Sequence, residues 1–117
     1  MNVFRIGDHI PAFDMEVGEC RHLSVQTRDK LRMVADIAYG PTPRQKLDIF
    51  FPAGGGEDLP VHMFVHGGYW RMFSKDDFSH VANTVTAAGA IGVIISFDLM
   101  PSVGLAEVVR QVRRARD

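Results

Sequence analysis

Cysteine is nearly missing from this sequence, which has only Cys20 among its 117 residues. A single cysteine cannot form an intramolecular disulfide or a cysteine-rich zinc site, and this favours a reducing, cytoplasmic setting. Long apolar runs are also missing, because the longest, Ala87 to Ile95, is far shorter than the roughly 20 residues that cross a bilayer. Residues 1–9 carry charges of both signs and lack the apolar core of an export signal. These absences predict a soluble protein with no membrane partner.

The sequence also lacks a strong excess of positive or negative charge. The 13 basic and 14 acidic side chains give a formal net charge of -1, which argues against a nucleic-acid partner. Hydrophobic residues make up 46% and charged residues 23%, as in globular chains that bury a core. The length allows one domain at most. We expect residues 1–30 to form a lead-in with room for one short helix, and residues 31–117 to form the core of a sheet.

Alternation of apolar and polar side chains predicts two strands in the first part of that core. The pattern holds over residues 33–37 and again over residues 47–51, with proline- and glycine-containing segments at 40–43 and 52–56. Because only a short link separates the two strands, we expect them to form an antiparallel pair.

A strand–helix–strand unit is predicted next. The nearly continuous apolar run 61–65 indicates a strand that is covered on both faces and lies inside a sheet. Ser74 and Asp77 have the spacing of a capping box, so a helix is expected to begin there and to end at Gly89. The apolar run 91–97 then returns the chain to a parallel strand. A last helix follows Gly104, with an apolar stripe of Leu105, Val108, Val109 and Val112.

The most informative segment follows the strand at 61–65 and reads Val65-His66-Gly67-Gly68-Tyr69-Trp70-Arg71. Two glycines at the carboxyl end of a buried strand let the backbone approach a ligand, and open α/β sheets bind ligands at that end. Outward-facing N–H groups there are what an oxyanion hole requires. Residues 66–70 resemble the HGGxW signature of the α/β-hydrolase superfamily, in the branch of arylformamidases (kynurenine formamidases) and related carboxylesterases. Residues 39–52 and 97–115 also resemble that branch, so the likeness covers about Ala35 to Ala115.

The resemblance implies an α/β fold: the N-terminal portion of an α/β-hydrolase domain, with an antiparallel strand pair followed by a βαβα unit and an incomplete sheet. It also implies an oxyanion hole at Gly67, Gly68 and Tyr69, of which Gly68 and Tyr69 are the favoured donors. Substrate contacts are implied at His66, Tyr69 and Trp70. No cofactor is implied.

The nucleophile of that branch is a serine in a GxSxG turn, and none of the five serines here lies in such a turn. We therefore expect the serine, the acid and the base to lie beyond residue 117, and this chain alone to be inactive. The expected substrate of the whole hydrolase is a small formamide or carboxylic ester, and the sequence leaves this choice open.

Other candidates carry less chemistry. His62 and His66 share a strand face, but without a third ligand a packed histidine pair is favoured over a metal site. The segment 18–22 imitates a nucleophile turn around Cys20, with histidine in place of the second glycine, and is rejected. Asp98 has a structural role in the family pattern. The arginines of the last helix are assigned to a solvated face: Arg110, Arg113, Arg114 and Arg116.

A non-catalytic interpretation stays open beside the hydrolase. In the family pattern the strand at 61–65 is flanked by a fourth and a fifth strand, and no fifth strand is found here. The exposed edge predicts dimerisation, aggregation or a molten state. The alternative function is a small α/β module that binds a partner along this edge.

Overall fold

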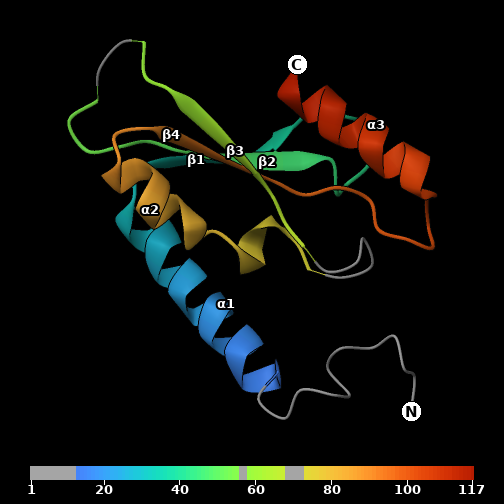
Figure 1. Cartoon of the computed structure of the whole chain (residues 1–117), viewed down its shortest axis with the longest axis horizontal. Helices are drawn as coiled ribbons and strands as arrows, with labels where there is room; N and C mark the ends of the chain where they lie inside the picture. The colour runs from blue at the N-terminus through green and yellow to red at the C-terminus, as the bar shows by residue number, and fades with distance from the viewer. Residues whose placement is uncertain (1–12, 56–57, 68–72) are drawn as a thin grey trace.

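The computed structural model describes residues 13–55, 58–67 and 73–117 (Figure 1). The elements follow the order α1 (Phe13–Lys30), β1 (Met33–Ala38), β2 (Lys46–Phe50), β3 (Val61–Val65), the 3-10 turn η2 (Lys75–Asp77), α2 (Val81–Ala87), β4 (Ile91–Ile95) and α3 (Leu105–Arg116). None of the helices in these ranges has the length and apolar character of a segment that crosses a membrane.

The four strands form one sheet in the order β1-β2-β4-β3. β1 and β2 pair antiparallel, as predicted, and β2 continues antiparallel to β4. β3 and β4 pair in parallel, with Val61 beside Ile91 and Val65 beside Ile95, which confirms the strand–helix–strand unit. The mixed sheet and its helices therefore match the predicted α/β fold.

Helices cover both faces of the sheet. Successive side chains of a strand point to opposite faces, so neighbouring residues of β4 pack against different helices. Ile94 of β4 packs with Phe50 and with Ala82 of α2. Its neighbour Ile95 packs with Leu47, Phe97 and Val108 of α3 on the other face. Figure 1 shows the same division, with α1 and α2 on one side of the sheet and α3 on the other.

The position of β3 differs from the expectation of a strand covered on both sides. It is the last strand of the sheet, and Val61 and Val65 are 63% and 40% exposed. The reason is that β4 inserts between β2 and β3, so β3 has one strand neighbour among the described residues. This placement agrees with the predicted exposed edge. We call the outer side of β3, with Val61 and Val65, the open edge.

The helices also depart from the sequence prediction in detail. α1 spans 18 residues instead of a short helix. Asp77 accepts a hydrogen bond from the Ser74 backbone N–H as expected, but the pair caps η2, and α2 begins later, at Val81. Gly89 follows α2 with a φ of 85°, as a helix-ending glycine does.

The predicted stripe of α3 is only partly covered. Val108 is buried, whereas Leu105 and Val109 are 45% and 42% exposed. The four arginines of α3 are exposed, as predicted for a solvated face, although Arg114 also donates a hydrogen bond to Gln45 on the β1–β2 link.

Candidate active site

The predicted oxyanion segment begins at the carboxyl end of β3. His66 and Gly67 lie there, directly after Val65. Gly68, Tyr69 and Trp70 lie outside the described residues, so their roles as oxyanion donors and substrate contacts stay predictions. Gly67 is exposed, and no described heavy atom lies within 4 Å of a Cβ built on it. The backbone at Gly67 is therefore open to approach, as an anion-binding turn requires.

The side chain of His66 is held between aromatic rings. Its imidazole is 4% exposed and stacks on Phe97 at 4.4 Å between ring centroids, with Phe78 stacked at 5.9 Å. Nδ1 lies 2.8 Å from the carbonyl oxygen of Gly67. Burial lowers the pKa of His66 below its ordinary value, so the neutral ring carries its proton on Nδ1 and donates it to that carbonyl.

His66 therefore fixes the backbone at the start of the predicted oxyanion segment. Nε2 is buried and finds no hydrogen-bond partner within the described ranges. His62, four residues earlier, is exposed. Across the residues that the structure describes, no group of three or more metal-ligating side chains gathers, and a substrate contact by His66 stays a prediction.

The residues that follow the predicted oxyanion segment, beginning at Phe73, form its far flank. This flank lies at the carboxyl end of β4. The carbonyl of Phe73 accepts a hydrogen bond from Arg44 Nη2 at 2.6 Å. The backbone N–H of Lys75 donates to Ser96 Oγ at 2.8 Å. Because Ser96 follows β4 directly, the chain returns after residue 72 to the place where His66 also packs.

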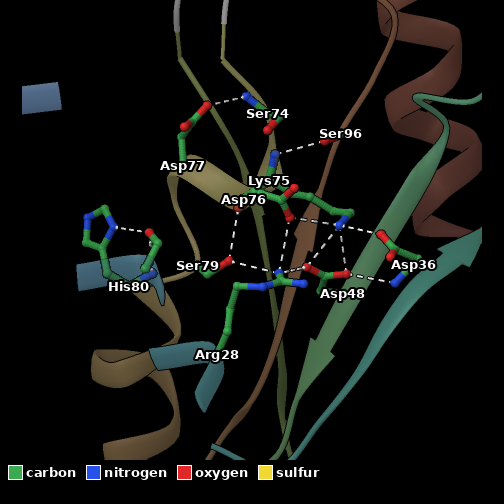
Figure 2. Close-up of polar contacts among 11 residues, drawn as sticks. Arg28, Asp36, Asp48, Ser74, Lys75, Asp76, Asp77, Ser79, His80 and Ser96 are labelled. Carbon is green, nitrogen blue, oxygen red and sulfur yellow. Dashed lines mark hydrogen bonds and ion pairs between the residues drawn. The ribbon is translucent and has the colours of Figure 1, made fainter. Parts of the chain in front are cut away.

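An ionic cluster centred on the buried residues Asp48 and Lys75 lies beneath this flank, and we define it as Arg28, Asp36, Asp48, Lys75 and Asp76 (Figure 2). Asp48 of β2 has no exposed surface and accepts from Arg28 at 2.5 Å and from Lys75 at 3.0 Å. Lys75 also contacts Asp36 at 2.7 Å and Asp76 at 3.1 Å. The cluster joins α1, β1, β2 and η2.

The contacts within the cluster favour the charged forms of Lys75 and Asp36. Burial disfavours the ammonium of Lys75, but hydrogen bonds to Asp36 and Asp48 outweigh this effect and raise the pKa of Lys75. The bond to Lys75 is the main cause that lowers the pKa of Asp36. The sequence patterns did not predict the cluster, although they held one signal: the acidic Asp48 lies between the apolar residues Leu47 and Ile49.

Two further polar contacts bear on candidate catalytic groups. Ser24 Oγ lies 3.0 Å from His80 Nδ1 and also accepts from the His80 backbone N–H, but Ser24 has no exposed surface and cannot reach a substrate. Asp98 accepts from Thr42 and from Gln111. These contacts give Asp98 the structural role that the sequence predicts.

Comparison with known proteins shows which hydrolases this chain is similar to. No model of a known protein family matches the chain. It is 31% identical over 90 residues to a kynurenine formamidase from Danio rerio, covering 77% of this chain and 31% of that protein. A kynurenine formamidase from Salmo salar is 29% identical over 90 residues, with the same coverage. The chain spans about a third of the length of these relatives.

Solved structures agree. A thioesterase candidate from Silicibacter sp. superposes with a TM-score of 0.85 at 29% identity, over 96% of this chain and 43% of that one. Esterase B from Lactobacillus rhamnosis gives 0.68 at 15% identity, over 88% and 36%, and shows the fold alone. The sheet and its helices thus define an α/β-hydrolase. Within that superfamily, the similarity to kynurenine formamidases supports the arylformamidase- and carboxylesterase-like branch.

Proposed function

We propose that this chain supplies the oxyanion hole of a hydrolase that cleaves a formamide or a carboxylic ester, with a serine nucleophile located outside residues 1–117. The observation that carries the proposal is His66–Gly67 at the carboxyl end of a parallel strand, where the buried ring holds the Gly67 carbonyl. The similarity to kynurenine formamidases supports the same chemistry. In this proposal residues 31–117 belong to the sheet core of a hydrolase domain, and residues 1–30 lead into it.

The proposed mechanism assigns one task to the segment after β3. Attack of a serine oxygen on the substrate carbonyl places negative charge on the carbonyl oxygen. The backbone N–H groups of Gly68 and Tyr69 donate hydrogen bonds to that oxygen, with Gly67 completing the turn. Tyr69 and Trp70 line the aromatic or acyl side of the pocket, and His66 borders it. An oxyanion donor of this kind contributes about 100- to 1,000-fold to the rate.

The substrate in this proposal is a small molecule, with neither nucleic acid nor membrane as partner, and the location is cytoplasmic. The single cysteine and the balanced charge support these points.

Hydrolysis of N-formylkynurenine and of a p-nitrophenyl ester tests the function. The 117-residue chain is expected to show no turnover, and the product of the whole reading frame to hydrolyse at least one substrate. In that product, Gly68→Pro removes one N–H donor, whereas Gly68→Ala keeps it. A kcat that falls in both variants by the same factor would contradict the donor role. Turnover by the 117-residue chain that disappears in Cys20→Ala would overturn the whole proposal.

The open edge favours a second candidate function, a non-catalytic module that binds a partner strand. Exposed Val61 and Val65 and the outward backbone groups of β3 support it. Light scattering and amide exchange decide between the two. A monodisperse monomer with slow exchange at Met63 to Val65 favours the module.

A further inference from the structure

Arg44 joins two backbone carbonyls that are far apart in the sequence. Nε donates to the carbonyl of Phe97 at 2.8 Å, and Nη2 donates to the carbonyl of Phe73 at 2.6 Å. Arg44 comes from the link between β1 and β2, whereas Phe97 follows β4 and Phe73 precedes η2. One guanidinium therefore fastens the far flank of the predicted oxyanion segment to the end of β4.

The near flank reaches the same place through aromatic contacts. The ring of His66 stacks on Phe97, whose carbonyl Arg44 holds. Phe78 contacts His66 on one side and Phe73 on the other, with ring centroids 5.9 and 5.5 Å apart. Phe97 and Phe78 therefore connect the near flank, at His66, with the far flank, at Phe73.

The backbone of Phe73 has a strained conformation that requires a stabilising contact. Its φ is 72°, a left-handed conformation that a bulky L-residue adopts only when its surroundings impose it. The hydrogen bond from Arg44 to the Phe73 carbonyl acts directly on the strained residue.

We propose that Arg44 is a positioning residue, which sets the spacing between the two flanks of the oxyanion segment by bridging the carbonyls of Phe73 and Phe97. The proposal rests on the proposed function for its catalytic meaning. Arginine suits this role because its planar fork presents separate donors in fixed directions, whereas the compact ammonium of lysine does not hold two carbonyls in that fixed geometry. Arg44→Lys therefore keeps the charge and removes the bridge.

Amide exchange in the 117-residue chain tests the bridge without any assay of activity. In Arg44→Lys and Arg44→Met, the Lys75 amide, which donates to Ser96, is expected to exchange about tenfold faster. Amides of β2 and β4 keep their wild-type rates. Arg110→Lys is the matched control, since Arg110 is an exposed arginine paired with Glu107 on α3.

Titration of the His66 ring by NMR is a second readout. Burial and, to a smaller extent, the nearby Arg44 cation lower the pKa of His66, whereas the hydrogen bond to the Gly67 carbonyl and Asp77 raise it. The His66 pKa is therefore expected to rise in Arg44→Met. Lys75 exchange that stays at the wild-type rate in both variants, or equal acceleration throughout the sheet, would each overturn the proposal.

Kinetics of the whole hydrolase test whether the Arg44 bridge affects catalysis. Arg44→Lys is expected to lower kcat by about 10- to 100-fold, as misplaced oxyanion donors do, with KM changed by less than about twofold. Faster Lys75 exchange with an unchanged kcat would show that the bridge does not position the hole. If the wild-type hydrolase cleaves neither substrate class, the proposed function fails, and the exchange result alone decides whether Arg44 holds the flanks.

Discussion

The ionic cluster and the open edge show two ways in which this sheet meets its surroundings. In the cluster, buried Asp48 is enclosed by cations from α1 and η2. At the open edge, Val61 and Val65 are exposed and the outer backbone groups of β3 have no strand partner among the described residues. The polar groups around β2 therefore find their partners within the chain, whereas β3 presents a surface suited to another strand. The following predictions test this contrast, from the largest expected effect on stability to the smallest.

Removing the charge of Asp48 is expected to be the most damaging change. Asp48→Asn leaves buried Lys75 and half-buried Arg28 without their central carboxylate, although both keep Asp76, and losing one partner of a buried ion pair costs up to about 3–5 kcal/mol. Urea denaturation measures the loss. Asp29→Asn, at an exposed position on α1, is the control and should change stability by less than about 0.5 kcal/mol. Equal effects of the two variants would show that the cluster is not needed for stability.

Alkaline pH is expected to weaken the fold through Tyr39. Burial is the main cause that raises the pKa of Tyr39 to about 12, and its hydroxyl donates to the carbonyl of Ser96. The unfolded chain releases this proton at a lower pH, with the ordinary pKa of 10.0, so stability is full below that pH and is lost as pH rises toward about 12.

Tyr39→Phe removes this part of the pH dependence. Thermal melts of both proteins between pH 9 and 12 (roughly the range in which tyrosine titrates) measure it, and parallel curves would contradict the prediction. Lys75, whose pKa is also raised from its ordinary value of 10.5, remains in both proteins, so the loss of stability that it causes above that pH is common to both.

Mild acid is expected to act through His66 at the end of β3. Burial lowers its pKa in the folded chain, so the unfolded chain takes up a proton first, and stability falls as pH drops below 6.5. His66→Asn keeps a side-chain N–H donor but does not titrate, and should flatten the curve between pH 7 and 5 (roughly the titration range of histidine). His62→Asn, at an exposed position, is the control and should change the unfolding free energy at neutral pH by less than about 0.5 kcal/mol.

The open edge is expected to affect association more than stability. Val65→Lys places a charge on the exposed end of β3 and should shift the chain toward monomer in size-exclusion chromatography with light scattering. Its unfolding free energy should change by less than about 0.5 kcal/mol. Val34→Lys on β1 is the control, because Val34 is also exposed, at 48%. If both variants reduce association equally, the contact does not depend on β3.

Local patterns were sufficient to predict most of the sheet. Alternation at 33–37 and 47–51 and the apolar runs at 61–65 and 91–97 identified four strands, and the parallel pair followed from the helix between two of them. These features depend on neighbours in the sequence. The position of β3 at the edge was also expected from the resemblance, although its apolar composition alone suggested a strand covered on both sides.

Contacts between distant polar residues were not predictable in the same way. α1 has no strong apolar stripe, and its inner side instead carries Ser24 and Thr27, both buried. Thr27 accepts a hydrogen bond from Asn83, and Ser24 contacts His80, so the helix docks through pairs separated by 56 positions. Periodicity records which side chains are apolar, but it does not record which polar side chains find partners.

The insertion of β4 between β2 and β3 has a consequence for how the chain is made. During synthesis the β1–β2 hairpin can close as soon as residues 33–50 have emerged, because its partners are close in sequence. β3 then waits for α2 and β4, since Val61 pairs only with the later Ile91 in the described sheet. Until β4 arrives, both edges of β3 are exposed on the nascent chain. This interval is when the polypeptide is most open to mispairing and most in need of a chaperone.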